Sequence, residues 1–169
     1  MKKFELTEET KTVNGTILHQ IRALIDIERF GVIVGDLGGW LEKEENLSHS
    51  GDGWVSEDGW VFDNGWVFDN GRVFDNGQVF GNGWVFDDGQ VFGDGRVFGN
   101  GWVLGDGSVF DDGWVFGDGS VFGNGRVFDN GRVFGDGQVF GNGWVFGDGS
   151  VFGDGSVFGD EKFSAGVRK

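Results

Sequence analysis

The two histidines, His19 and His49, are the first residues of this sequence that could do chemistry, because an imidazole can act as a general base or as a zinc ligand near neutral pH. Neither histidine recurs at a regular spacing, and both precede the repetitive part of the chain. The sequence contains no cysteine, which excludes disulfides and thiolate metal sites. We therefore expect both histidines to be structural residues, and we predict no catalytic residue, no cofactor site and no metal ligand.

The second candidates for a chemical role are two pairs of adjacent acidic residues, Asp87-Asp88 and Asp111-Asp112. Paired carboxylates can transfer protons or bind a divalent cation. Segments such as Gly-Asp-Gly and Asp-Asn-Gly resemble the corners of calcium-binding β-roll repeats, but that family repeats nine residues with the pattern Gly-Gly-x-Gly-x-Asp. Aspartate is also common wherever the backbone turns tightly. Turn geometry is the simpler interpretation of these residues, and calcium binding is an alternative.

The third candidates are tryptophans at an 18-residue spacing, which could form a binding surface. If 18 residues make one turn of a coil, these tryptophans and the apolar residues that follow them predict an interaction strip on one face. The strip consists of Trp66, Trp84, Trp102, Phe68, Phe86 and Leu104. Aromatic side chains of this kind can stack on sugars or bases, or can bury themselves in a protein contact. A protein contact is the interpretation that we favour.

A six-residue unit positions all of these residues. The pattern Gly-x-Val-Phe-(Gly/Asp)-(Asn/Asp) runs from Gly53 to Asp160 without insertion or deletion, which makes 18 hexads. A short fixed period predicts a solenoid, in which each unit buries its apolar side only by stacking on its neighbours. The regular recurrence of Phe and Trp argues against a disordered glycine-rich tract.

Within a hexad, side chains are expected to alternate between the two faces of a short strand. Position 2 holds Trp, Arg, Gln or Ser, a mixture that fits only an outward-facing position. Position 3 is Val in every hexad, from Val55 to Val157, and is predicted to point inward, as is the glycine at position 1. Positions 5 and 6 hold Gly, Asp, Glu or Asn, which tolerate left-handed or tightly turned backbone. Each hexad is thus predicted to be a short strand followed by a corner.

Position 4 is Phe in 16 hexads, with Ser56 and Leu104 as the exceptions, and strict alternation places it outside. So many exposed rings would form a very large apolar surface for a monomer. We expect the rings to stack from coil to coil at ~4.8 Å, the spacing of strands in a sheet, and to bury part of their surface against a second molecule.

The chain divides into three predicted parts, residues 1–52, 53–160 and 161–169. The first part is expected to be an N-terminal cap that contains a β-hairpin around Asn14-Gly15 and a short strand over residues 31–35, with a helix within residues 21–30 as an alternative. The last part, residues 161–169, is expected to be a charged tail that protects the other end of the coil from end-to-end stacking.

Charge and composition restrict the function. The net charge is −15, and residues 53–160 carry 17 acidic side chains but only four arginines and no lysine. Such a surface repels nucleic-acid backbones and anionic membranes, so we expect neither as a direct partner. No stretch approaches the ~18 apolar residues that cross a membrane, and the N-terminus lacks the apolar core of a signal peptide. We expect a cytoplasmic location, with a phage particle as the alternative.

The hexads resemble a known family. The pattern aliphatic-x-x-x-small-x, present here as Val-Phe-Gly-Asn-Gly-Trp, is similar to that of the hexapeptide-repeat proteins, which form left-handed parallel β-helices with three hexads in each triangular turn. The present sequence departs from that pattern by having Gly at the small position and an aromatic residue after the inward aliphatic one. Parts of the N-terminal segment, including residues 35–42, resemble a capping segment of YdcK-like bacterial and prophage proteins, which have no established activity.

This resemblance implies an all-β fold, a single-stranded parallel β-helix (β-solenoid) that is left-handed, has three hexads per turn and carries a β-rich N-terminal cap. Many hexapeptide-repeat relatives are acyltransferases or carbonic anhydrases that use histidine. The acyltransferases also interrupt the coil with a loop that shapes the pocket. This sequence has no histidine in its repeat and no such loop. An enzyme is therefore the least favoured interpretation, and an acyltransferase is the least unlikely enzyme.

The sequence thus predicts a non-enzymatic structural or scaffold protein. Its exposed aromatic rows are expected to mediate either self-association into a homo-oligomer or the docking of a protein partner. The alternatives are an acidic mimic of nucleic acid that binds a DNA-binding protein, a carbohydrate-binding rod, and a calcium-dependent scaffold.

Overall fold

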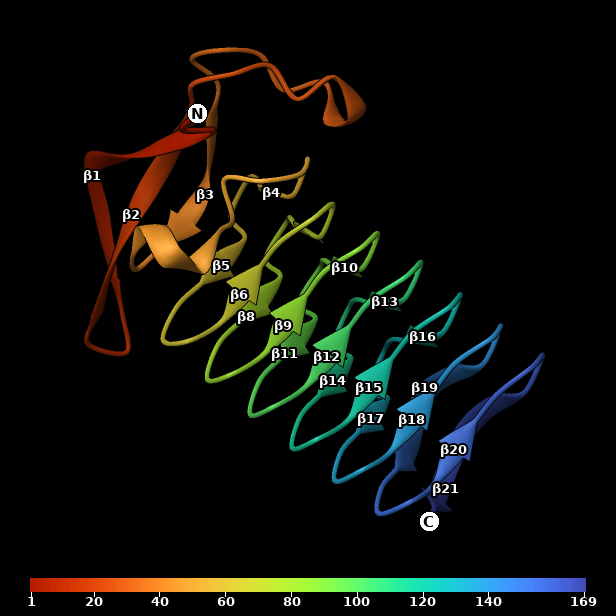
Figure 1. The fold of residues 1–169 in the computed structure, drawn as a ribbon. Helices are drawn as coiled ribbons and strands as arrows, with labels where there is room; N and C mark the ends of the chain where they lie inside the picture. The colour runs from red at the N-terminus through yellow and green to blue at the C-terminus, as the bar shows by residue number, and fades with distance from the viewer.

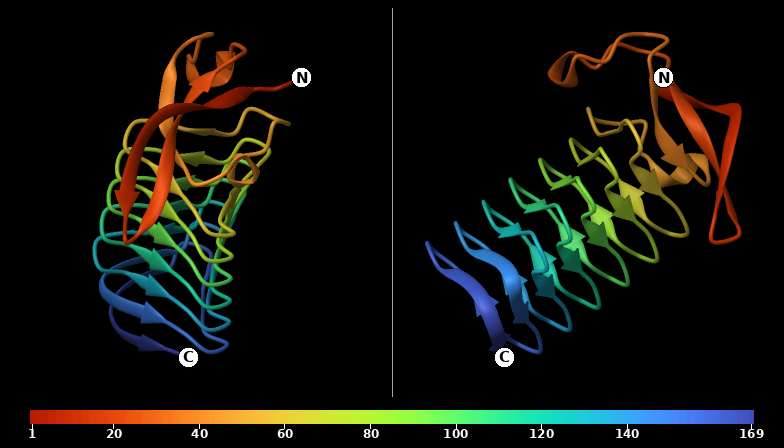
Figure 2. Two further views of the ribbon diagram at one scale, coloured as in Figure 1. Left: turned by 90° about the vertical axis from the view of Figure 1, so that its left-hand side faces the viewer. Right: turned by 180° about the vertical axis from the view of Figure 1, so that it is seen from behind.

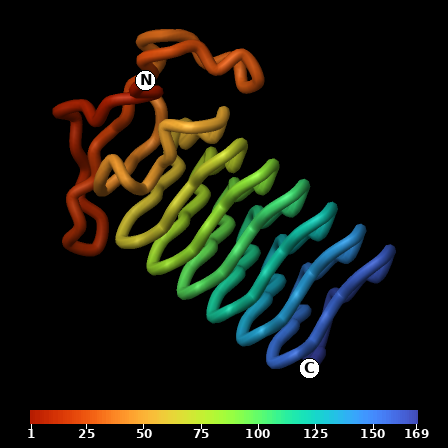
Figure 3. The backbone as a smooth tube through the Cα atoms, in the orientation of Figure 1, coloured from red at the N-terminus to blue at the C-terminus, as the bar shows by residue number.

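The computed structural model describes residues 1–169 and shows an all-β parallel solenoid of about seven turns, with about 18 residues in each turn. The coil advances steadily from the N-terminal cap to the C-terminus (Figure 1), and the backbone trace shows successive turns of similar shape lying side by side (Figure 3). Stacked strands are separated by 18 residues, as Trp84 and Trp102 are. The predicted all-β parallel β-solenoid and the three hexads per turn are confirmed.

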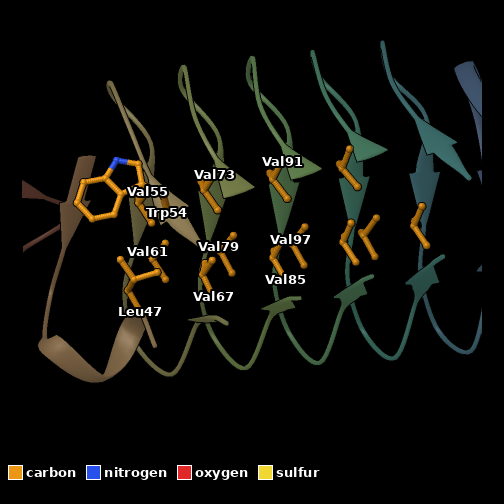
Figure 4. Close-up of a cluster of buried hydrophobic side chains, with 14 of the residues drawn as sticks. Leu47, Trp54, Val55, Val61, Val67, Val73, Val79, Val85, Val91 and Val97 are labelled. Atoms are coloured by element: carbon orange, nitrogen blue, oxygen red, sulfur yellow. The ribbon is translucent and has the colours of Figure 1, made fainter. Parts of the chain in front are cut away.

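The valines at position 3 form the core of the coil. All of them, from Val55 to Val157, are completely buried. The close-up in Figure 4 shows their side chains inside the coil, in rows that run from turn to turn. Burial of one valine side chain stabilises a fold by ~1.5–3 kcal/mol, so this single repeated position supplies a large share of the hydrophobic driving force. The predicted inward orientation of position 3 is confirmed.

Each hexad contributes a strand at positions 2 and 3, and these strands stack in parallel on three faces. The first face contains β4 (Trp54–Val55), β7 (Arg72–Val73), β10 (Gln90–Val91), β13 (Ser108–Val109), β16 (Arg126–Val127) and the start of β19 (Trp144–Val151). The second face contains β5 (Trp60–Val61), β8 (Gln78–Val79), β11 (Arg96–Val97), β14 (Trp114–Val115), β17 (Arg132–Val133) and the end of β19. The third face contains β6 (Trp66–Val67), β9 (Trp84–Val85), β12 (Trp102–Val103), β15 (Ser120–Val121), β18 (Gln138–Val139) and β20 (Ser156–Val157).

The three faces belong to two sheets. Because β19 crosses a corner, it joins the first and second faces into one 15-stranded sheet. The third face is a separate sheet of six strands, all parallel. Residues 18 apart therefore lie side by side on the outside of a face, which is the arrangement that the candidate strip requires.

The backbone at position 5 explains its Gly and Asp content. Every residue there has a φ between 49° and 62°, in the left-handed region that favours glycine and tolerates aspartate. At nearly every corner the N–H of the next glycine donates to the position-4 carbonyl three residues earlier, as Gly65 does to Phe62 at 3.0 Å, and Glu161 takes this role at the last corner. The predicted corner at positions 5 and 6 is confirmed.

A close approach between turns explains the glycine at position 1. A Cβ atom on Gly89 would lie 2.5 Å from the carbonyl oxygen of Val103 in the next turn. A larger residue fits there only if the backbone moves, because a well-packed interior does not absorb an added methyl group without strain. The glycine at position 1 therefore has a steric cause.

The phenylalanines at position 4 stack from turn to turn, as predicted. At the end of the second face, six rings from Phe62 to Phe152 form an uninterrupted row with centroids 4.9–5.0 Å apart. A similar row runs from Phe74 to Phe146 with centroids 4.7–5.1 Å apart. The rings of these two rows are all half-buried, whereas Phe158, which follows β20 on the third face, is exposed. The stacked rings therefore bury much of their apolar surface within the chain.

The N-terminal cap is a three-stranded antiparallel sheet. β1 (Phe4–Val13) and β2 (Thr16–Ala23) form the predicted hairpin around Asn14-Gly15, and β3 (Leu37–Leu41) pairs with the other edge of β2. β3 then pairs in parallel with β5, so the cap continues the sheet of the second face. Figure 2 shows the cap at the N-terminal end of the coil from two further sides.

The segment between β2 and β3 differs from the expectation. In place of a helix within residues 21–30 there is a single 3-10 turn, η1 (Glu28–Phe30), and in place of a strand over residues 31–35 there is an isolated bridge between Ile27 and Val32. Side chains satisfy the backbone there instead of a partner strand, because the carboxylate of Asp26 accepts a hydrogen bond from the N–H of Val34 at 2.8 Å.

A second 3-10 turn, η2 (Glu44–Asn46), leads into the first turn of the coil. These two short turns are the only helical segments. None of the helical segments has the length and apolar character needed to cross a membrane.

Donors of the cap satisfy three carbonyls at the N-terminal edge of the coil. Inside the coil, the carbonyl at position 1 accepts a hydrogen bond from the position-2 N–H of the preceding turn. The first turn has no complete preceding turn, and other donors take this role. The bonds run from Lys3 Nζ to Gly53 (2.7 Å), from the N–H of Trp40 to Gly59 (2.9 Å) and from Asn46 Nδ2 to Gly65 (2.8 Å). Lys3 and Asn46 are the two buried polar residues of the molecule.

The C-terminal residues continue the coil beyond the hexads. β21 (Lys162–Arg168) pairs in parallel with β19, and Phe163 takes the place of a valine beside Val145. A register shift within this pair accommodates the lost hexad pattern. Residues 161–169 are therefore ordered as a final strand, whereas the sequence suggested only a charged tail. Together with the cap, this strand extends the six turns of the hexads to about seven.

Candidate functional site

The third face brings the tryptophans of the sequence-predicted strip together. Because β6, β9 and β12 stack in register, Trp66 lies beside Trp84, and Trp84 lies beside Trp102. Their side chains point outward, since position 2 alternates with the buried valine. Trp66 is 36% exposed and Trp102 is 42% exposed, and no other tryptophan reaches this level of exposure.

The three tryptophan rings contact one another along the coil. The centroids of Trp66 and Trp84 are 5.7 Å apart with the rings perpendicular, and those of Trp84 and Trp102 are 5.5 Å apart with the rings parallel. Both geometries are favoured for aromatic pairs. The side of Trp102 that faces the C-terminus has no aromatic neighbour, because the next residue on this face is Ser120.

The apolar residues of the strip support the tryptophans from the following position. Phe68 lies 4.2 Å from Trp66 and 4.7 Å from Phe86, measured between ring centroids. Leu104 then interrupts this row of rings, which resumes only at Phe122. All six members of the predicted strip are therefore adjacent, and Trp102 is next to the point where the ring row stops.

A ladder of carboxamides runs along the corner beside the tryptophans. Asn64 donates to Asn82 at 3.3 Å, Asn82 to Asn100 at 3.1 Å, and Asn100 to the carboxylate of Asp118 at 2.9 Å. An open groove of about 630 Å³ lies between this ladder and the tryptophans. Each carboxamide keeps one N–H that the ladder does not use. Sequence reasoning missed the ladder, although its members also recur every 18 residues at position 6.

The other tryptophans at the surface are covered by cations of the same chain. The guanidinium carbons of Arg96 and Arg132, one turn to either side of Trp114, lie 5.3 and 5.1 Å from its ring centroid. The same kind of contact occurs at Trp144 with Arg126 and Lys162, and at Trp40 and Trp60 with Lys11. The remaining tryptophan, Trp54, is buried. Cation–π contacts are thus a regular feature of this molecule.

The third face has no such cation. Its position-2 residues are Trp66, Trp84, Trp102, Ser120, Gln138 and Ser156. Lys43 lies at the N-terminal end of the groove, where its Nζ donates to Asn64 at 3.4 Å and not to a ring. At the other end, Asp118 lines the groove and forms no ion pair. The exposed tryptophans therefore have no cation stacked on their rings, and the groove beside them is lined mainly by acidic and amide groups.

A second groove, of about 680 Å³, lies on the first face and provides a comparison. Its lining includes Trp144 together with Arg126 and Lys162, the two cations that cover that ring. This groove already contains its own positive charge. The third-face groove is the one whose aromatic rings lack a cationic neighbour.

The two histidines both have structural partners in the cap. His19 Nδ1 lies 3.1 Å from the carbonyl of Thr7 in the hairpin. His49 Nδ1 accepts the N–H of Lys3 at 3.2 Å, so its Nε2–H donates to Glu44 at 2.7 Å. The same contact to the imidazole, together with one to Lys2, holds the pKa of Glu44 below its ordinary value.

The paired acids Asp87-Asp88 and Asp111-Asp112 lie at corners. Asp87 and Asp111 have φ values of 50° and 49°, and the side chain of Asp88 pairs with Arg29 of the cap. No group of three or more His, Asp or Glu side chains is arranged to hold a metal ion.

Comparison with known proteins adds no family to this description: no protein-family model matches the chain, and no curated protein sequence is similar to it.

Proposed function

We propose that this protein is a non-enzymatic scaffold, a rigid acidic rod that docks a protein partner along its third face. The observation that carries this proposal is the tryptophan strip, with Trp66 and Trp102 more than a third exposed beside the groove of the carboxamide ladder. Tryptophan is enriched in the energetically dominant centres of protein interfaces. An aromatic row beside unused amide N–H groups offers such a centre together with hydrogen-bonding groups at its rim.

The regular hydrogen bonding of the coil supports the scaffold part of the proposal. Strand contacts between turns recur at nearly constant length, as from Trp84 to Gly101 at 2.9 Å and from Phe86 to Val103 at 3.0 Å. Stacked Phe rows reinforce the same spacing on the outside. A solenoid built in this way presents outward groups at fixed intervals and offers an extended binding surface.

Charge favours a different protein over a second copy of this chain. The net charge of −15 makes two parallel rods repel each other. The Phe rows, which would otherwise drive association, are already stacked within the chain. Among the tryptophans of the coil, only those of a short strip remain exposed, and the size of this strip suits a peptide segment or a loop of a partner.

The resemblance of the hexads to the hexapeptide-repeat proteins is part of the proposal. The similar YdcK-like proteins have no established activity, and the histidines of the present chain are engaged in the cap and not in the coil. The engagement of the histidines in the cap supports a binding role without catalysis.

Affinity capture with matched variants tests the proposal. Trp102→Gln alters the strip, and Trp114→Gln makes the same change on the second face. Both should fold, because Gln already occupies position 2 in Gln78, Gln90 and Gln138. We expect at least one protein that the parent and Trp114→Gln retain in equal amount and that Trp102→Gln loses. Identical capture by all three proteins would overturn the docking role, as would a parent homo-oligomer in sedimentation that only Trp102→Gln dissociates.

A further inference from the structure

The tryptophans of the third face lack a neighbour that the other surface tryptophans have. Trp114 lies between the guanidinium groups of Arg96 and Arg132, which belong to the turns before and after it. Trp144 is flanked by cations in the same manner. The chain places a cation over each of its other surface tryptophans. The uncovered rings of the third face therefore indicate a cation that another molecule supplies.

The position of the missing cation can be specified. The N-terminal side of Trp102 is covered by Trp84, whose ring is parallel to it. One turn further toward the C-terminus stands Ser120, paired with Trp102 in the strand register. The corresponding neighbour of Trp114 is Arg132, paired with it in the same register. The open side of Trp102 above Ser120 is therefore the place that a guanidinium group would fill.

The surrounding charges suit such a group. Asp118 lines the same groove as Trp102, and further carboxylates follow one and two turns on, at Asp136 and Asp154. None of these three carboxylates forms an ion pair within the chain. A guanidinium group can stack on an aromatic face and donate to a carboxylate at the same time, because it is planar and carries five N–H groups.

We propose that the third face binds an arginine-bearing, extended segment of a protein partner, with one guanidinium group stacked on the open side of Trp102 and bonded to Asp118. This inference rests on the docking role proposed above and specifies its partner chemistry. Further basic side chains of the segment lie along Asp136 and Asp154, and its backbone runs along the groove beside the carboxamide ladder.

Calorimetric titration with a defined peptide tests this inference. The probe is an eight-residue peptide, blocked at both ends, in which arginine alternates with serine. Ser120→Arg places the chain's own guanidinium group on Trp102, as Arg132 is placed on Trp114, and should therefore weaken binding roughly tenfold. Ser108→Arg adds the same charge on the first face and is the matched control. Arginine already occupies position 2 in four hexads, so both variants should fold, which circular dichroism verifies.

Two further comparisons address the stacking and the carboxylate. Trp102→Gln should weaken binding about as much as Ser120→Arg does, and Asp118→Asn should weaken it and reduce its dependence on salt. A peptide with lysine in place of arginine should bind more weakly, and one with glutamine should not bind.

Each contrary outcome has a distinct meaning. Equal weakening by Ser120→Arg and Ser108→Arg would show attraction to net charge alone and would overturn the inference. Unchanged binding to Trp102→Gln would overturn it as well. If the arginine peptide does not bind but a captured protein still depends on Trp102, the inference fails and the docking role stands. If no captured protein depends on Trp102 either, both proposals fail.

Discussion

At the scale of single residues, Glu57 occupies a position that the repeat otherwise fills with glycine or aspartate. Its φ is 55°, a conformation that costs an ordinary side chain about 1–2 kcal/mol. The pKa of Glu57 is raised above its ordinary value, first by a hydrogen bond with the side chain of Asp75, and further by desolvation and by repulsion from that carboxylate. Glu57 therefore combines a strained backbone with an unfavourable charge.

We expect Glu57→Gly to raise the free energy of unfolding by roughly 0.5–1 kcal/mol, because relief of the backbone strain exceeds the added entropy of the unfolded chain. Glu57→Ala removes the charge but keeps the strained φ, and should give a smaller gain. Urea denaturation of the two variants and the parent measures both effects. Equal stabilisation by Ala and Gly would assign the effect to charge alone.

The pH dependence of Glu57 has a defined sign. Because its pKa is raised on folding, the folded state binds the proton more tightly than the unfolded state. This residue therefore makes stability decrease as the pH rises through the carboxyl range. Glu57→Gly and Glu57→Ala should both lack this contribution to the pH dependence of the free energy of unfolding.

Single positions of the hexad were predictable to different degrees. The inward direction of Val and the turn at positions 5 and 6 follow from alternation and backbone preference alone, and both are confirmed. The steric need for Gly89 and the guanidinium groups beside Trp114 could not be derived in this way, because they depend on distances between turns and on side-chain rotamers. The 18-residue spacing still identified the strip.

At the scale of elements, the cap closes the coil with side-chain donors. Lys3 is fully buried, and its Nζ donates to the carbonyls of Gly53 at 2.7 Å and Gly51 at 3.2 Å. Burial lowers the pKa of Lys3 from 10.5 to about 8, although the nearby carboxylate of Asp52 opposes this shift. A neutral amine can still donate both hydrogen bonds, so the bonds survive deprotonation.

The lowered pKa of Lys3 predicts that the protein becomes more stable at alkaline pH. Because its pKa is lowered on folding, the unfolded state binds the proton more tightly, and the free energy of unfolding rises between about pH 8 and pH 10.5. The expected rise is about 3 kcal/mol. Lys3→Met should lose it, so the difference in stability between parent and variant should grow with pH. Guanidinium denaturation at several pH values measures this difference, and parallel pH profiles for the two proteins would contradict it.

The elements outside the hexads were the hardest to predict from the sequence. The hairpin around Asn14-Gly15 was predictable because a two-residue turn between strand-like segments is a strong local signal. The 3-10 turn in place of a helix and the strand β21 were not, because neither segment carries a repeating pattern. Nothing local shows that Lys3 would reach Gly53, fifty residues away in the chain.

At the scale of the whole molecule, the rod behaves as a stack of nearly equivalent turns. Each turn contacts only its neighbours along the coil, so stability is expected to be close to a sum of turn and interface contributions. The strip of the third face depends on one condition, which is that residues 18 apart remain side by side. The register of the turns is therefore the property that connects fold and proposed function.

Deletions of different length test this dependence on register. Removal of residues 113–130 takes out three hexads, or one complete turn, and leaves the order of the faces unchanged. The shortened protein should unfold cooperatively, with a urea m-value lower by about one seventh, because one of about seven turns is absent. Removal of residues 113–121 deletes half as many residues but shifts the following hexads by half a unit, so that valines of one turn meet corners of the next. The smaller deletion should therefore be the more destabilising one. If it is instead the more stable variant, the turns do not depend on the 18-residue register, and the alignment of Trp66, Trp84 and Trp102 loses its structural basis.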